Sequence, residues 1–84
     1  MSDELTISAD ILNNENLLPI EKIVLADLKR LDKGEGIKIN NTDMSKRYYV
    51  TKGRCSQIVV KLEREGHLTT TYDNQNNRTI KIKE

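Results

Sequence analysis

The chain of 84 residues contains no tryptophan or phenylalanine, and it has only one cysteine, one histidine and one proline. A single cysteine cannot form an internal disulfide, and one cysteine with one histidine is too few to form a zinc-binding cluster. No apolar run approaches the roughly 18 residues of a membrane span, and the acidic, polar N-terminus does not resemble a signal peptide. These absences predict a cytoplasmic protein without a membrane segment, a disulfide, a metal or another cofactor.

The sequence also lacks the usual features of an enzyme. It has no phosphate-binding glycine loop and no nucleophile near a base, and its 13 carboxylates are scattered along the chain. A chain of this length needs most of its residues for one small core, which leaves little room for a small-molecule pocket. We therefore expect a binding protein rather than an enzyme, with no small-molecule ligand.

The clearest positive signal is an amphipathic helix from about Lys52 to Glu65. Thr51 is suited to cap its N-terminus, and Gly66 is suited to end it in the left-handed conformation. Because a buried thiol usually packs as a small apolar group, we expect core packing rather than a redox switch for the cysteine of this helix. Four apolar side chains recur at the spacing of one helical stripe: Cys55, Ile58, Val59 and Leu62.

The opposite face of this helix is polar and basic. Arginine, glutamine and serine side chains can hydrogen-bond to base edges, valine can contact a thymine methyl group, and glycine lets the backbone approach a phosphate. A solvated helix face is the alternative interpretation of the same pattern. The residues of this face and its flanks are Lys52, Gly53, Arg54, Ser56, Gln57, Val60, Lys61 and Arg64.

Charge is divided unevenly along the chain. Residues 1–44 carry a net charge of −4 and residues 45–84 a net charge of +5, although the whole chain is nearly neutral at +1. A basic region that coincides with a candidate DNA-facing helix is what phosphate binding requires, because each neutralised phosphate releases counterions. Chance segregation of charge in a small, charge-rich chain is the alternative.

A β-hairpin is predicted after Gly66, with strands near 68–72 and 79–83 and a turn at 73–77. Its alternation predicts that Ile80 and Ile82 cover the helices while Lys81 and Lys83 point outward. Arg78, at the base of the turn, is expected to reach an adjacent minor groove. A charged edge-strand residue that prevents aggregation is the alternative role for this arginine.

Three elements are predicted upstream. Pro19 suits the first turn of a helix that ends near 33–36, and residues 36–39 alternate like a brief strand that could pair with the hairpin. A short helix is expected over Thr42–Val50, capped by Asn41 or Thr42, with Met44 and Tyr48 on its buried side. The apolar face of the first helix is expected to comprise Ile20, Ile23, Val24, Leu28 and Leu31.

The order helix, strand, helix, helix, hairpin from about Leu17 to Ile82 resembles the DNA-binding half of the MarR family of regulators. The matching features are Leu17-Leu18-Pro19, the segment from Thr51 to Leu68, and a wing that ends in Arg78. The most specific of them is the pattern Leu62, Glu63, Gly66 and Leu68 within that segment. The sequence departs from the family at Asn76, where aspartate is usual, and at Tyr49, where a small residue is usual. It also ends just past the wing, so we expect a truncated domain without the family's C-terminal dimerisation helices.

The resemblance implies an α+β winged helix-turn-helix with three main helices, a short strand and a C-terminal hairpin wing. We expect this domain at residues 17–84, preceded at 1–16 by an arm or short helix in which Leu5, Ala9 and Leu12 share a face. Its expected function is sequence-specific binding of double-stranded DNA as a transcriptional regulator, such as a repressor, with a homodimer as one arrangement.

The expected mechanism places the helix of residues 52–65 in the major groove. The expected roles are Arg54, Ser56 and Gln57 at base edges, Lys52 and Lys61 on phosphates, and Arg78 in the minor groove, with Thr51 and Gly53 completing the DNA-binding set.

Two other functions fit the same residues. One is a plasmid or phage replication accessory that binds origin or single-stranded DNA, in which Tyr49 stacks on bases while Tyr48 and Tyr72 cover the core and helices. The other is a winged-helix module that binds proteins.

Overall fold

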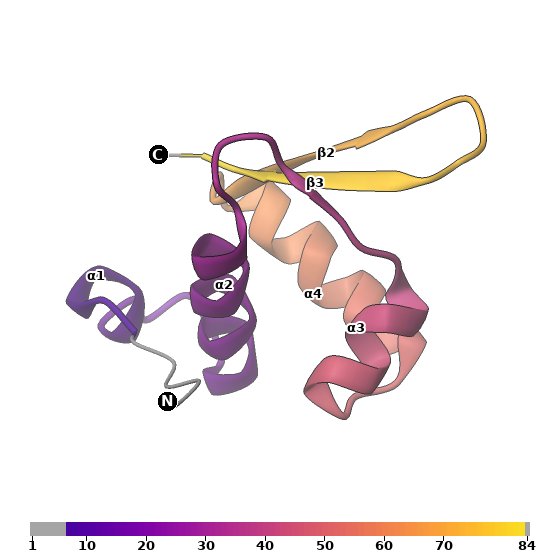
Figure 1. Cartoon of the computed structure of the whole chain (residues 1–84). Coiled ribbons are helices and arrows are strands. Elements are labelled where there is room, and N and C mark those ends of the chain that lie inside the picture. The colour runs from indigo at the N-terminus through magenta and orange to yellow at the C-terminus, as the bar shows by residue number, and fades with distance from the viewer. Residues whose placement is uncertain (1–6, 84) are drawn as a thin grey trace, which may run out of the picture.

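The computed structural model describes residues 7–83, which form an α+β domain with four helices and one three-stranded antiparallel sheet (Figure 1). None of these helices has both the length and the apolar character needed to cross a membrane. The sheet order is β1-β3-β2, so the last strand of the chain is central. The elements are α1 (Ala9–Leu12), α2 (Pro19–Leu31), β1 (Ile37–Lys38), α3 (Asn41–Tyr48), α4 (Lys52–Arg64), β2 (Leu68–Tyr72) and β3 (Arg78–Ile82).

Helix α4 forms where its sequence pattern predicts. Thr51 caps it, with its side-chain oxygen accepting a hydrogen bond from the Arg54 amide at 3.1 Å. Glu65 follows the last helical residue, and Gly66 then adopts a left-handed φ of +84° that reverses the chain into β2. The four residues of the apolar stripe, Cys55 included, are all buried.

Helix α3 begins one residue earlier than expected, at Asn41. Its cap is Asn40, whose extended backbone lets the side chain accept a hydrogen bond from the Asp43 amide at 2.7 Å. The expected cap, Asn41, is already helical. The helix ends at Tyr48, two residues before the expected end at Val50, because Tyr49 adopts a left-handed φ of +57°. This tight turn leads into α4.

The hairpin and the short strand pair as predicted. Ile80 faces Thr70 of β2 on one side and Ile37 of β1 on the other. Ile80 is fully buried, whereas Lys81 and Lys83 are exposed. The expectation for Tyr72 was wrong, because its side chain is 63% exposed. It lies at the turn end of β2, where the hairpin extends beyond the helices (Figure 1).

Both N-terminal helices bury a different set of residues from the one expected. In α1 the buried residue is Ile11, while Ala9 and Leu12 are exposed; Leu5 lies outside the described residues. Ser8 caps this single turn and thereby turns Ile11 inward. In α2, Ile23 is 40% exposed and Leu25 is buried instead. Because α2 packs against both α1 and α4, its buried surface is wider than one stripe.

One apolar core joins the helices to the sheet. Side chains from α2, α3, α4, β2 and β3 meet there with no exposed surface. They include Leu28, Met44, Ile58, Leu62, Leu68 and Ile80.

Helix α2 also buries a charge, on Asp27, which is only 6% exposed. Its carboxylate accepts hydrogen bonds from Arg47 Nε at 2.5 Å, Tyr48 Oη at 2.7 Å and Arg30 Nη2 at 2.9 Å. Burial alone raises the pKa of Asp27, but the hydrogen bonds from Arg47, Tyr48 and Arg30 outweigh it and lower this pKa to about 2. Asp27 therefore fixes α3 against α2 through a paired, buried carboxylate.

This shift makes stability depend on pH. Because the folded-state pKa is lowered, the contribution of Asp27 is fully present above about pH 4 and is lost as the pH falls towards 2; the shift corresponds to about 2 kcal/mol. We expect Asp27→Asn to lower the free energy of unfolding at neutral pH by at least about that amount. Between about pH 4 and pH 2 the free energy of unfolding should decrease less in this variant than in the original protein. Urea titrations at several pH values measure both effects. Asp10→Asn, at an exposed position of α1, is the control, and a profile for Asp27→Asn that matches the control would contradict the assignment.

Candidate nucleic-acid interface

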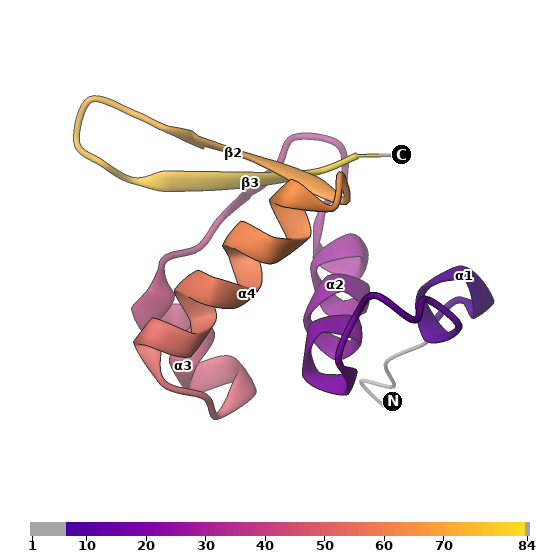
Figure 2. The same cartoon turned by 180° about the vertical axis from the view of Figure 1, so that it is seen from behind.

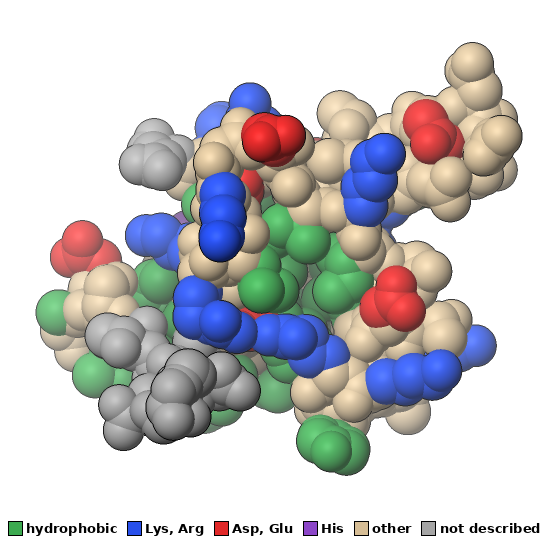
Figure 3. Space-filling model, in the orientation of Figure 1, with side chains coloured by type: hydrophobic (Ala, Val, Ile, Leu, Met, Phe, Trp, Pro, Cys, Tyr) green, Lys and Arg blue, Asp and Glu red, His purple; other side chains and the backbone are tan. Residues whose placement is uncertain are grey.

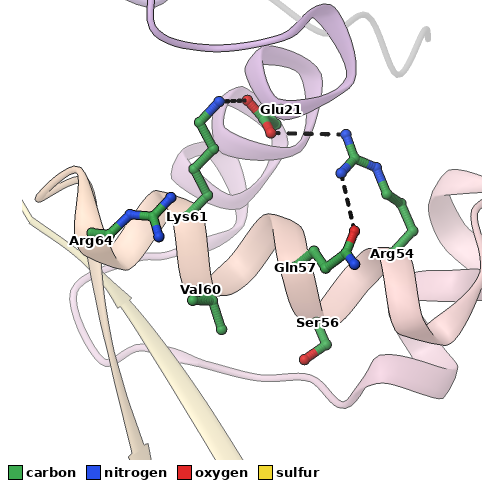
Figure 4. Close-up of a pocket in the computed structure, with 7 residues that line it drawn as sticks. All are labelled: Glu21, Arg54, Ser56, Gln57, Val60, Lys61 and Arg64. Atoms are coloured by element: carbon green, nitrogen blue, oxygen red, sulfur yellow. Dashed lines mark hydrogen bonds and ion pairs between the residues drawn. The ribbon is translucent and has the colours of Figure 1, made fainter.

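The outer face of α4 carries most of the residues selected from the sequence. Thr51, Lys52, Gly53, Ser56 and Gln57 are exposed, and Arg64 and Val60 extend the same face towards the sheet. Figure 2 shows α4 crossing the front of the molecule beneath the hairpin. In Figure 4, Ser56 and Val60 project from α4 away from α2. This strip contains no acidic residue before Glu63.

A shallow, open groove of about 350 Å³ lies where α4 passes the first turn of α2. It mixes charged, polar and apolar side chains, unlike the enclosed and mainly apolar pockets that hold small molecules. The groove is lined by Glu21, Arg54, Ser56, Gln57, Val60, Lys61 and Arg64.

Glu21 is the acidic member of this groove and is only 2% exposed. One carboxylate oxygen accepts hydrogen bonds from the Leu18 amide at 2.7 Å and from Lys61 Nζ at 2.9 Å. The other lies 3.9 Å from Arg54 Nη2 (Figure 4). Burial raises the pKa of Glu21, but the hydrogen bonds from Leu18 and Lys61 and the charge of Arg54 lower it overall.

Lys61 and Arg54 therefore turn towards α2 rather than outward, which differs from the direction expected for contacts with phosphates and bases. At about 100° per residue, positions seven apart share one flank of a helix, and this flank packs beside α2. Arg54 also donates a hydrogen bond from Nη1 to Gln57 Oε1 at 3.3 Å. The sequence did not single out Glu21, although a glutamate at the third position of a helix is the usual acidic member of a capping box.

Arg78 does not reach outward either, because its side chain is buried with 8% exposure. Its Nε donates to the Ile39 carbonyl at 3.0 Å, and its Nη2 lies 3.1 Å from Met44 Sδ. The minor-groove position expected for Arg78 does not match this geometry. Strand alternation explains the difference, since Arg78 shares the inward face of β3 with Ile80.

The turn between α3 and α4 presents Tyr49, which is 92% exposed. This residue immediately precedes the segment that leads into the N-terminus of α4. Tyr48, in contrast, packs against the core and donates to Asp27. Tyr49 is therefore available for contact with a partner next to the outer face of α4.

Basic side chains are not confined to that face. Figure 3 shows Lys and Arg side chains around a hollow on the side that carries α2 and α3, with apolar side chains at its floor. A separate open groove of about 390 Å³ is lined by Ile37, Lys38, Ile39, Asp43, Lys46 and Arg47. Two arginines, Arg30 and Arg47, are paired with Asp27, which reduces the charge they offer to a partner.

No family model, curated protein or solved structure matches the chain, so the interpretation of this surface depends on its own geometry.

The position of Arg78 predicts a structural effect of its removal. We expect Arg78→Met to lower the free energy of unfolding by about 1–3 kcal/mol, because it leaves the buried Ile39 carbonyl without its donor. Lys52→Met, at an exposed position, should stay within about 0.5 kcal/mol of the original protein. Urea unfolding followed by circular dichroism measures both variants. An unchanged free energy of unfolding in Arg78→Met would contradict the buried position and support the exposed role expected from the sequence.

Proposed function

We propose that residues 17–84 are a winged helix-turn-helix domain that binds double-stranded DNA and regulates transcription. In this proposal α3 and α4 are the helix-turn-helix pair, and the β2–β3 hairpin is the wing. The observation that carries it is the exposed outer face of α4, which is free of acidic side chains up to Glu63 and lies beside a projecting hairpin. A helix with this exposure has the dimensions that the major groove admits.

The proposed reading residues lie on the exposed outer face of α4. Ser56 and Gln57 offer hydrogen-bonding groups to base edges, and Val60 offers a methyl contact to thymine. Lys52 and Arg64 supply exposed positive charge at the two ends of the helix. At Gly53 no atom beyond its chain neighbours and the backbone of its own helix lies within 4 Å of the position that a Cβ would occupy, so a phosphate can approach the backbone there.

The geometry changes three of the roles expected from the sequence. Arg54 and Lys61 are proposed at the edge of the interface, where Glu21 holds them. Arg78 supports the wing from inside, through Ile39 and Met44. In place of Arg78, the exposed turn at 73–77 is proposed to contact the minor groove, where its asparagine and glutamine side chains can form hydrogen bonds.

Regulation is proposed to follow from occupancy of a promoter. A single domain of this size presents one helix to the groove and reads one half-site, whereas palindromic sites are read by two copies. A homodimer on DNA is therefore part of the proposal, and sedimentation with and without a selected duplex measures it.

The decisive experiment is a fluorescence anisotropy titration with labelled DNA. A duplex of about 20 base pairs, selected on the protein from a random pool, is compared with its scrambled form and with a single strand at about 50 to 200 mM salt. Tighter, salt-dependent binding of the selected duplex supports the proposal. Preference for the single strand supports a replication role instead, and the absence of salt-dependent binding to any DNA supports a protein-binding module.

The roles proposed for Gln57 and Lys52 predict different effects of their substitution on DNA binding. We expect Gln57→Ala to weaken binding of the selected duplex by about 1–3 kcal/mol with little effect on the scrambled one, because it removes a base contact. Lys52→Met should weaken both duplexes alike and reduce the salt slope by about 1, because it removes a phosphate contact. The same titrations measure both variants. Equal losses on the two duplexes for Gln57→Ala would remove its base-reading role.

A further inference from the structure

We propose that Glu21, although it lies outside the outer face of α4, determines DNA specificity by withholding Lys61 and Arg54 from phosphates and by positioning Gln57. This inference rests on the proposed DNA-binding function. In it Glu21 is a positioning residue that acts through α4 and makes no contact with DNA.

The carboxylate of Glu21 is held between α2 and α4. Glu21 projects from the first turn of α2 between two cations that lie about two turns apart on α4 (Figure 4). It is 2% exposed, and its oxygens lie 2.9 Å from Lys61 Nζ and 3.9 Å from Arg54 Nη2. The Leu18 amide donates to the same carboxylate oxygen that Lys61 contacts and helps to hold it in place. Both cations are thus drawn to one fixed, buried anion.

Releasing these cations from Glu21 costs free energy. A buried carboxylate that loses its partner is strongly destabilised, so a phosphate that recruits Lys61 must compensate for the charge left at Glu21. Each cation that does not reach a phosphate removes about 0.9 from the slope of log affinity against log salt. Glu21 therefore weakens the part of DNA binding that is independent of sequence.

Glu21 is linked through Arg54 to a residue that faces the groove. Arg54, drawn to Glu21 by Nη2, donates through Nη1 to Gln57 Oε1 at 3.3 Å. This contact orients the amide and leaves the hydrogens of Gln57 Nε2 free to donate to an acceptor. In the major groove guanine, adenine and thymine each offer an acceptor, whereas cytosine offers only a donor. The chain from Glu21 through Arg54 to Gln57 thus disfavours cytosine at the contacted position.

Glu21→Gln tests this arrangement, because glutamine keeps an oxygen for the Leu18 amide and removes the charge. Binding is measured by anisotropy with the selected duplex and its scrambled form across the same salt series. Glu35→Gln removes one negative charge from the exposed loop between α2 and β1 and is the matched control. We expect Glu21→Gln to bind the scrambled duplex more tightly, with a salt slope steeper by about 0.9 for each freed cation. The ratio of selected to scrambled affinity should fall about tenfold, whereas the control should keep it.

A second variant keeps the test independent of any loss of folding in Glu21→Gln. If Glu21 withholds Lys61 from DNA, Lys61→Met leaves the salt slope on the scrambled duplex unchanged. A slope reduced by about 0.9 would instead show that Lys61 contacts phosphate and would overturn the inference. A Glu21→Gln variant that is folded and matches the Glu35→Gln control would also overturn it. Failure of the original protein to bind any duplex would reject the proposed function itself.

Discussion

A buried charge must be paired, and the arrangement of the helices depends on this requirement. Helix α2 buries two carboxylates that need partners. Asp27 finds its partners mainly in α3, and Glu21 finds its cations in α4. Neither helix can shift along α2 without breaking an ion pair to a buried carboxylate, and breaking such a pair typically costs about 3–5 kcal/mol. Two charges on one helix therefore fix the relative positions of the pair that is proposed to meet DNA.

The same requirement determines how much of the basic half of the chain is available to a partner. Arg47, Arg54 and Lys61 lie beside the carboxylates of α2, and Arg78 is buried beneath the sheet. The net charge of +5 for residues 45–84 thus overstates the positive charge that faces solvent. A sequence count treats every lysine and arginine alike, whereas the fold assigns several of them to structure.

Helix capping and side-chain alternation predicted much of the fold, because interactions between residues close in sequence determine these features. Thr51 and Gly66 mark the ends of α4 through backbone geometry that neighbouring residues fix, and alternation placed Ile80 and Lys81 on opposite faces of β3. Alternation also places Arg78 inward, so its burial was predictable. The direction of Lys61 was not, because it depends on which flank of α4 packs beside α2. Likewise, no local pattern distinguishes the buried Asp27 from an exposed aspartate before its partners in α3 are known.

These features give the proposed interface a particular balance between affinity and specificity. Cations supply sequence-independent affinity to DNA, whereas side chains that contact base edges, the role proposed for Ser56 and Gln57, discriminate between bases and add less to overall attraction. With Lys61 and Arg54 held by Glu21, one copy of the domain would bind most DNA weakly and a matching half-site better. Two copies on adjacent half-sites would restore affinity, because binding of the first raises the effective concentration of the second. In this proposal the buried carboxylate of Glu21 thereby favours binding of two copies to a specific site over general coating of DNA.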